Sequence, residues 1–278
     1  MRHPSLSHIV WRDLCQQSPL EILYNLLLPL PFLLLSWWCA YYGWWLPALA
    51  GSFLFFTAAL RQAHDAYHST LGVGRRFNDF MLYALTSTML CSTHAIKKTH
   101  LNHHRDPLGT SDVEGNWARL PWYKAIIGGG VFSVRIQWYG LTHGSKRARR
   151  QVAFDMLIIL SIFAAALLWS PAVLVYHVLV MLLANTLVGF FAVWSVHHDC
   201  DETIYARSER HPLANLLTFN LLYHMEHHLF PAVPTQHLPA LAKRLEATAP
   251  EWVQQSVLPM SKAAPKLLPA IATKKPLR

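Results

Sequence analysis

Ten of the 17 histidines in this sequence stand in four short clusters. Two clusters have the pattern HxxHH, one has the pattern HxxxH, and one is a pair of adjacent histidines. They comprise His64 and His68 in HDAYH; His100, His103 and His104 in HLNHH; His197 and His198; and His224, His227 and His228 in HMEHH. Neutral imidazole is a ligand for zinc, copper, iron and nickel, so the clusters predict metal binding.

The spacing within the clusters indicates how many metal ions they serve. Positions i, i+3 and i+4 of an α-helix are neighbours on its surface, so HxxxH is expected to present two imidazoles to one site and HxxHH three. Nine or ten imidazoles exceed the four ligands of a structural zinc ion. Cys15, Cys39, Cys91 and Cys200 have no CxxC spacing, which disfavours an iron–sulfur cluster. We therefore expect two metal ions, each with four or five nitrogen ligands and some open coordination.

Carboxylates stand beside the histidine clusters in the sequence. Metal-bound histidine usually donates its second ring N–H to a carboxylate or a carbonyl group, which orients the ring. We expect this role for Asp65, Asp106, Asp199 and Glu226. Direct ligation and an ordinary solvated charge are the alternatives for each of them.

The composition is that of a membrane protein, with 53% apolar and only 14% charged residues. A helix that crosses about 30 Å of hydrocarbon needs about 20 mostly apolar residues. The sequence therefore predicts an all-α integral membrane protein with two transmembrane helical hairpins. The four spans are expected at residues 20–42, 44–60, 152–169 and 172–196.

The distribution of basic residues predicts which side of the membrane carries the clusters. None of the 24 Lys and Arg residues lies at the hairpin tips, 40–44 and 168–173. The positive-inside rule then places both termini and a helical cap with the metal site in the cytoplasm. We divide the chain into a cytoplasmic segment 1–19, a membrane domain 20–234 and a cytoplasmic segment 235–278. The net charge of +9 suits anionic lipid headgroups, and no nucleic-acid-binding motif accompanies it.

Three motifs, HDAYH, HLNHH and YHMEHHLFP, resemble the membrane-bound histidine-box fatty acid desaturases in order and interval. The resemblance covers residues 53–234, and its most specific part is NLLYHMEHHLFPAVP from Asn220 to Pro234. HDAYH and HLNHHRDP, followed by Asp112, are also similar to the related carotenoid hydroxylases and ketolases. In proteins of this kind an extra histidine after the last span binds metal. Here that is His197 or His198; the spacing leaves the choice open, with a slight preference for His198.

The resemblance implies a non-haem di-iron oxidoreductase that uses O2. The expected reaction is the introduction of a double bond into a fatty acyl chain of a membrane lipid or acyl thioester. A hydroxylase or ketolase acting on a carotenoid or another hydrophobic substrate is the alternative. No fused HPGG motif of a cytochrome b5 is present, so a separate ferredoxin or cytochrome b5 would donate the electrons. The bacterial inner membrane and the endoplasmic reticulum are both compatible locations.

A third interpretation is a non-catalytic metal-binding or transport protein of the membrane. Transporters place polar ligands near the middle of the bilayer. The predicted spans contain little of this kind beyond Asn25, His177 and Asn185, and the clusters stand at the span ends. This distribution favours an enzyme over a transporter.

Overall fold

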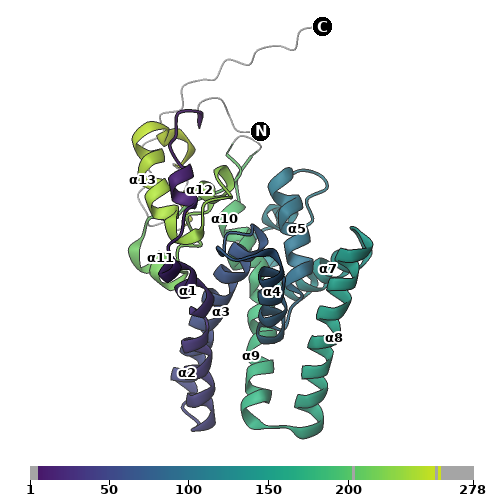
Figure 1. Ribbon diagram of the computed structural model, residues 1–278. Helices are drawn as coiled ribbons and strands as arrows, with labels where there is room; N and C mark the ends of the chain where they lie inside the picture. The colour runs from purple at the N-terminus through teal and green to yellow at the C-terminus, as the bar shows by residue number, and fades with distance from the viewer. Residues whose placement is uncertain (1–5, 202–203, 254–255, 258–278) are drawn as a thin grey trace.

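The computed structural model describes residues 6–201, 204–253 and 256–257. Every regular element in these residues is helical, which confirms the predicted all-α fold for the described part of the chain. Two long hairpins extend from one side of the molecule, and shorter helices form a cap over their other ends (Figure 1).

The first hairpin consists of α1 (Pro19–Leu27) and α2 (Leu30–Tyr41), which run to the tip, and α3 (Trp45–Tyr67), which returns. Pro29 separates α1 from α2, because proline lacks the N–H that would continue the helical ladder. Gly43 forms the tip with a φ of 73°, a left-handed conformation that glycine adopts at low cost.

The second hairpin consists of α8 (Lys146–Trp169) and α9 (Ala172–Val188). Ser170 ends α8 in the left-handed region, with a φ of 47°. Beyond α9 the helix widens into the π-helical segment η4 (Gly189–Trp194) and closes with α10 (Ser195–His197). His177 lies within α9, and its ring nitrogens contact Trp37 Nε1 at 3.1 Å and the Thr88 carbonyl at 2.8 Å.

Three helical stretches in the described residues are long and apolar enough to cross a membrane: Pro19–Tyr41, Lys146–Trp169 and Ala172–His197. Helix α3 has 23 residues but is less apolar, since its last turns carry Arg61, Gln62 and Asp65. The predicted second span, residues 44–60 within α3, therefore stays a prediction.

The cap is built from the segments between and after the hairpins. Residues Leu238, Leu241 and Leu245 of α13 pack with Phe230 and with Leu6 from the start of the chain. This small core holds the last histidine cluster over the ends of the hairpins. The cap elements are η2 (Arg12–Cys15), α4 (Arg75–Met89), α5 (Thr93–Arg105), η3 (Gly115–Arg119), α6 (Trp122–Ile127), α7 (Gly129–Thr142), α11 (Pro212–Leu217), α12 (His224–Leu229), η5 (Thr235–His237), α13 (Leu238–Thr248) and η6 (Pro250–Trp252).

Candidate metal centre

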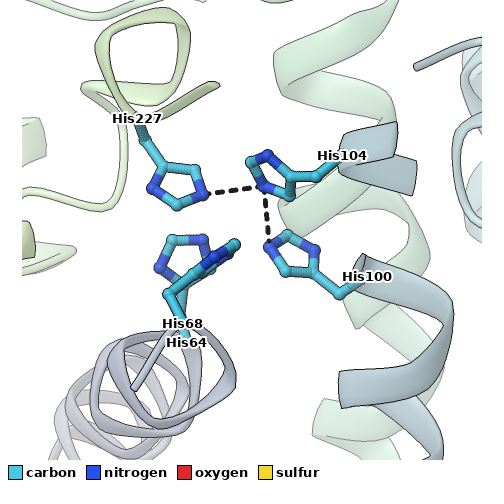
Figure 2. Close-up of side chains that lie close together, drawn as sticks. All are labelled: His64, His68, His100, His104 and His227. Carbon is cyan, nitrogen blue, oxygen red and sulfur yellow. Dashed lines mark hydrogen bonds between the residues drawn. The ribbon is translucent and has the colours of Figure 1, made fainter. Parts of the chain in front are cut away.

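Nine of the ten predicted histidines meet where the hairpin ends adjoin the cap, and they form two groups. Within each group one ring nitrogen of every histidine lies within 4.8 Å of the others. Figure 2 shows the five rings of the first group facing one another from α3, α5 and α12. We call the groups pocket A (His64, His68, His100, His104 and His227) and pocket B (His103, His197, His224 and His228).

Each HxxHH cluster divides its histidines between the two pockets, so the expectation of three imidazoles for one site was wrong. Successive helical residues are rotated by about 100°, so i and i+4 differ by about 40°, whereas i+3 lies about 60° to the other side of i. Accordingly, His100 and His104 face pocket A, while His103 faces pocket B. The division is reversed in α12, where His224 and His228 face pocket B and His227 faces pocket A.

The start of α5 is fixed by a buried polar cluster. The Ser92 hydroxyl accepts a hydrogen bond from the Ala95 N–H at 3.1 Å, which caps the helix. Asp155 of α8 accepts from the Ser92 hydroxyl and from the His94 N–H, and it contacts His94 Nδ1 at 3.0 Å. These bonds to α8 set the rotation of α5 about its axis and so the directions of its clustered histidines.

The nitrogen geometry of pocket B is suited to a metal ion. The four Nε2 atoms form a closed ring of contacts of 3.1, 2.9, 3.2 and 3.2 Å, in the order His103, His197, His224, His228. The Nδ1 of His197 contacts the Tyr205 carbonyl at 2.6 Å, and because a carbonyl only accepts, this nitrogen carries the proton. In a neutral ring the Nε2 then presents a lone pair. A neutral imidazole whose lone pair is directed at the other nitrogens is the form that a metal ion binds.

The nitrogens of pocket A are also suited to a metal ion. His104 Nε2 lies 3.1 Å from His100 Nε2 and 2.8 Å from His227 Nε2. Both ring nitrogens of His64 and the Nε2 of His68 are buried without a hydrogen-bond partner. Buried polar atoms are normally paired, so these orphaned nitrogens indicate a ligand. Two nitrogens bound to one metal ion at about 2.0–2.1 Å lie at most about 4.2 Å apart. The Nε2–Nε2 contacts of 2.8–3.2 Å in the two pockets are within this limit.

Burial keeps several of these imidazoles in the form that binds metal. Removal from water, together with the neighbouring histidines, holds the pKa values of His224, His227 and His228 well below the ordinary value. These rings are neutral at physiological pH. Burial also acts to lower the pKa of His103, but the hydrogen bond to Asp112 and the charges of Glu114 and Asp112 outweigh it and raise that pKa.

The carboxylates that contact the clustered histidines are not those predicted. Asp112 Oδ2 lies 2.6 Å from His103 Nδ1, and Glu114 Oε1 lies 3.0 Å from His100 Nδ1. Both residues lie in the loop before η3, eight and ten residues beyond His104. The signals in the sequence were the pair of acidic residues in DVE, shortly after the second cluster, and the place of Asp112 after HLNHHRDP.

The four predicted carboxylates have other surroundings. In the described residues none is hydrogen-bonded to a clustered histidine, so this expectation needs correction. Neighbouring side chains in a helix project from its axis in directions about 100° apart. The side chains of Asp65 and Glu226 therefore point away from the imidazoles of the adjacent histidines. Asp65 accepts from Thr235, Glu226 accepts from Ser208 and Arg210, the Asp106 side chain lies against Gly109, and the Asp199 side chain is 87% exposed.

Of the adjacent pair, His197 enters pocket B and His198 lies outside both groups. The His198 ring stacks on Trp194 at 4.1 Å, and its Nδ1 contacts the Trp194 carbonyl at 3.0 Å. The π-helical segment η4 precedes the pair and contains a wider turn, which changes the direction of the residues that follow it. Sequence spacing alone carries no sign of this widened turn.

An apolar cavity of about 140 Å³ adjoins the two pockets. Its walls include His64 and His100 of pocket A and His224 of pocket B. Away from the histidines it is lined mainly by apolar side chains of α3, α7 and the α9–η4 helix, among them Phe56, Leu60, Phe132, Ile136, Val188 and Phe191. An apolar chain can therefore reach both groups of histidines.

The fold and the site together define an all-helical protein with membrane-length apolar helices and two adjoining polyhistidine pockets. Residues 42–257 match the sequence model of the fatty acid desaturase family, and the chain belongs to this family. The family assignment made from the histidine motifs is thereby confirmed.

Curated relatives are similar to the chain at a lower level of identity. The sphingolipid delta(4)-desaturase/C4-monooxygenase of Bos taurus is 28% identical over 212 residues, which are 68% of this chain and 60% of that protein. The corresponding protein of Homo sapiens is 27% identical over 205 residues, with the same shares covered. The chain thus spans about 60% of the length of the curated relatives that it matches.

Proposed function

We propose that this protein is an O2-dependent di-iron oxidoreductase that introduces a double bond into a fatty acyl chain of a membrane lipid or acyl thioester. The observation that carries the proposal is the apolar cavity whose walls contain histidines of both pockets. A site of this kind combines two polyhistidine groups with room for a saturated chain. Family membership supports the same reaction class.

The roles of the residues follow from their positions. Pockets A and B would each hold one iron, with His103 and His100 oriented by Asp112 and Glu114. When bound, the irons supply O2 activation and hydrogen abstraction from an unactivated C–H bond. The apolar side chains bind the lipid chain by the hydrophobic effect, exclude water and hold neighbouring carbons beside the histidines.

Hydroxylation is the second candidate, because the names of the curated relatives include both a desaturase and a monooxygenase activity on sphingolipids. Both reactions begin with removal of one hydrogen from the chain. Removal of a hydrogen from the adjacent carbon gives a double bond, whereas insertion of oxygen gives an alcohol. A carotenoid or another hydrophobic compound as the substrate is part of this alternative.

We also propose a topology with four spans, in which α3 crosses the membrane as the second span. Both hairpin tips then lie on one side, and the termini, the cap and the metal pockets lie on the cytoplasmic side of a bacterial inner membrane or the endoplasmic reticulum. The segments 1–19 and 235–278 would flank the membrane domain 20–234. A separate ferredoxin or cytochrome b5 would supply electrons from that side. The absence of Lys and Arg from the tips supports this orientation.

Lipid analysis after heterologous expression tests the proposed reaction. Cells that express the wild-type chain should contain a lipid with two hydrogens fewer; a product with one additional oxygen would instead support the hydroxylase. His227→Ala should abolish the product while the protein stays in the membrane. His198→Ala is the matched control, because its ring lies outside both pockets. The proposal would be contradicted if the lipids stayed unchanged in cells that express the wild-type chain, with the protein loaded with iron and a suitable electron donor present.

A further inference from the structure

A basic patch is formed by residues of α4, α5 and α8, three helices that contact one another (Figure 1). Its members are Arg75 of α4, Lys97 and Lys98 of α5, and Lys146 and Arg147 of α8. Arg147 Nη2 lies 3.1 Å from Asp79 Oδ2, which joins the start of α8 to α4. Lys98 lies beside the turn before α8, since a Cβ atom on Gly144 would lie 3.5 Å from its Cε atom.

The cations of this patch lie where they cost stability, because the amino end of a helix carries a partial positive charge. Helix α4 begins with Arg75 and Arg76, α8 begins with KRARR, and neither has an acidic residue in its first turn. Burial lowers the pKa of Lys97, and the charge of Asp79 opposes this effect. The charges of Arg75 and Arg147 lower that pKa further. A bound anion would relieve this repulsion.

An exposed apolar surface continues from the basic patch along α4 and α8. Tyr83 of α4 and Phe154 of α8 pack edge to face, with ring centroids 5.2 Å apart. These residues lie four and seven positions beyond Asp79 and Arg147, respectively, so the two helices run in the same direction away from the patch. Phe80 and Phe154 are exposed on this surface. Helix α8 is also one of the stretches that are long and apolar enough to cross a membrane.

We propose that an anionic phospholipid binds at this surface, with its phosphate at the basic patch and its acyl chains against α4 and α8. Arginine suits a phosphate, because its planar guanidinium offers several N–H donors in a fixed arrangement. Lys and Arg residues next to the end of a membrane-spanning helix attract anionic headgroups. The exposed rings beyond the patch favour a lipid over an acidic soluble protein, which has no acyl chain to place there.

A competition titration of the full-length protein in an uncharged detergent tests the proposal. It follows the displacement of a fluorescent phosphatidylglycerol by dioctanoyl phosphatidylglycerol, dioctanoyl phosphatidylcholine or glycerol phosphate. Phosphatidylglycerol should bind at least about 5-fold more tightly than phosphatidylcholine, which has no net charge, and salt should reduce the difference. Equal affinity for the two lipids would overturn the proposal. Glycerol phosphate that bound as tightly as phosphatidylglycerol would overturn the role of the acyl chains, and with it the lipid.

Substitutions assign the preference to the basic patch. Arg75→Gln and Lys146→Gln should each lower the affinity for phosphatidylglycerol about 5-fold and leave the affinity for phosphatidylcholine unchanged. Their melting temperatures should not fall, because each removes a cation from the first turn of a helix. Lys243→Gln is the matched control, because it removes the same charge from an exposed position of α13. Full affinity in both patch variants, or an equal loss in Lys243→Gln, would overturn the assignment.

An acidic electron-transfer protein is the other partner that a basic surface fits. The rate at which a reduced ferredoxin delivers electrons to the iron-loaded chain is measured in phosphatidylcholine nanodiscs, for the wild type and Arg75→Gln. An unchanged rate together with weaker lipid binding is the expected result. A slower rate in Arg75→Gln, together with wild-type affinity for phosphatidylglycerol, would assign the surface to the protein and overturn the lipid.

Discussion

The substitution Asp112→Asn should weaken metal binding in pocket B. All four groups around this carboxylate are donors: His103 Nδ1 at 2.6 Å and the Leu108 N–H at 3.0 Å on Oδ2, and the Glu114 and Gly115 N–H groups at 3.1 and 2.9 Å on Oδ1. An asparagine replaces one acceptor oxygen with an NH2 group. In either orientation this NH2 group faces two donors.

The substitution is expected to lower both the stability of the protein and its affinity for metal. Each buried donor left without an acceptor costs about 1–3 kcal/mol, so two of them lower the free energy of unfolding by about 2–6 kcal/mol. If the NH2 group instead donates to His103 Nδ1, the ring proton moves to Nε2, the atom that faces pocket B. Loss of such a supporting carboxylate typically lowers metal affinity about 10–100-fold, or about 1.4–2.8 kcal/mol.

The assay is a chelator titration that follows the iron retained per chain. The wild-type protein should hold two equivalents, and Asp112→Asn should release one of them at a roughly 10–100-fold lower chelator concentration. Asp199→Asn is the matched control, because the same chemical change falls on an exposed side chain. Equal iron retention in all three proteins would refute the role of Asp112 in supporting His103. An equal loss of iron from Asp199→Asn would show that the effect is not specific to Asp112.

Further predictions concern ligands and packing. His197→Ala should lose one equivalent of iron, whereas His198→Ala should retain both, and the reverse result would exclude the observed assignment. Chelation of the iron should lower the melting temperature, and added Fe(II) should restore it, since a ligand of the folded state stabilises it; an unchanged melting temperature would argue against metal in the pockets. Gly129→Ala should destabilise the protein by about 1–3 kcal/mol or more, because a Cβ atom there would lie 1.6 Å from the Thr186 carbonyl oxygen. Gly130→Ala meets no atom within 4 Å and should be neutral or stabilising by up to about 1 kcal/mol, so equal melting temperatures for the two variants would contradict the close approach of α7 and α9.

The local sequence pattern was enough to predict the long helices and to identify the histidines that form the two pockets. Runs of apolar residues with few charges predict helices of membrane length, and the short turns at Gly43 and Ser170 follow from the breaks between those runs. The motif spacing also identified the family, because the three histidine motifs occur in a specific order.

Only the tertiary structure decided how the histidines are shared between two pockets. The direction of a side chain depends on the rotation of its helix, and packing sets that rotation, as Asp155 does for α5. The choice of His197 over His198 follows a widened turn that leaves no mark in the sequence. The partners of His100 and His103 come from a loop, Asp112–Glu114, whose path is determined by contacts rather than by distance along the chain.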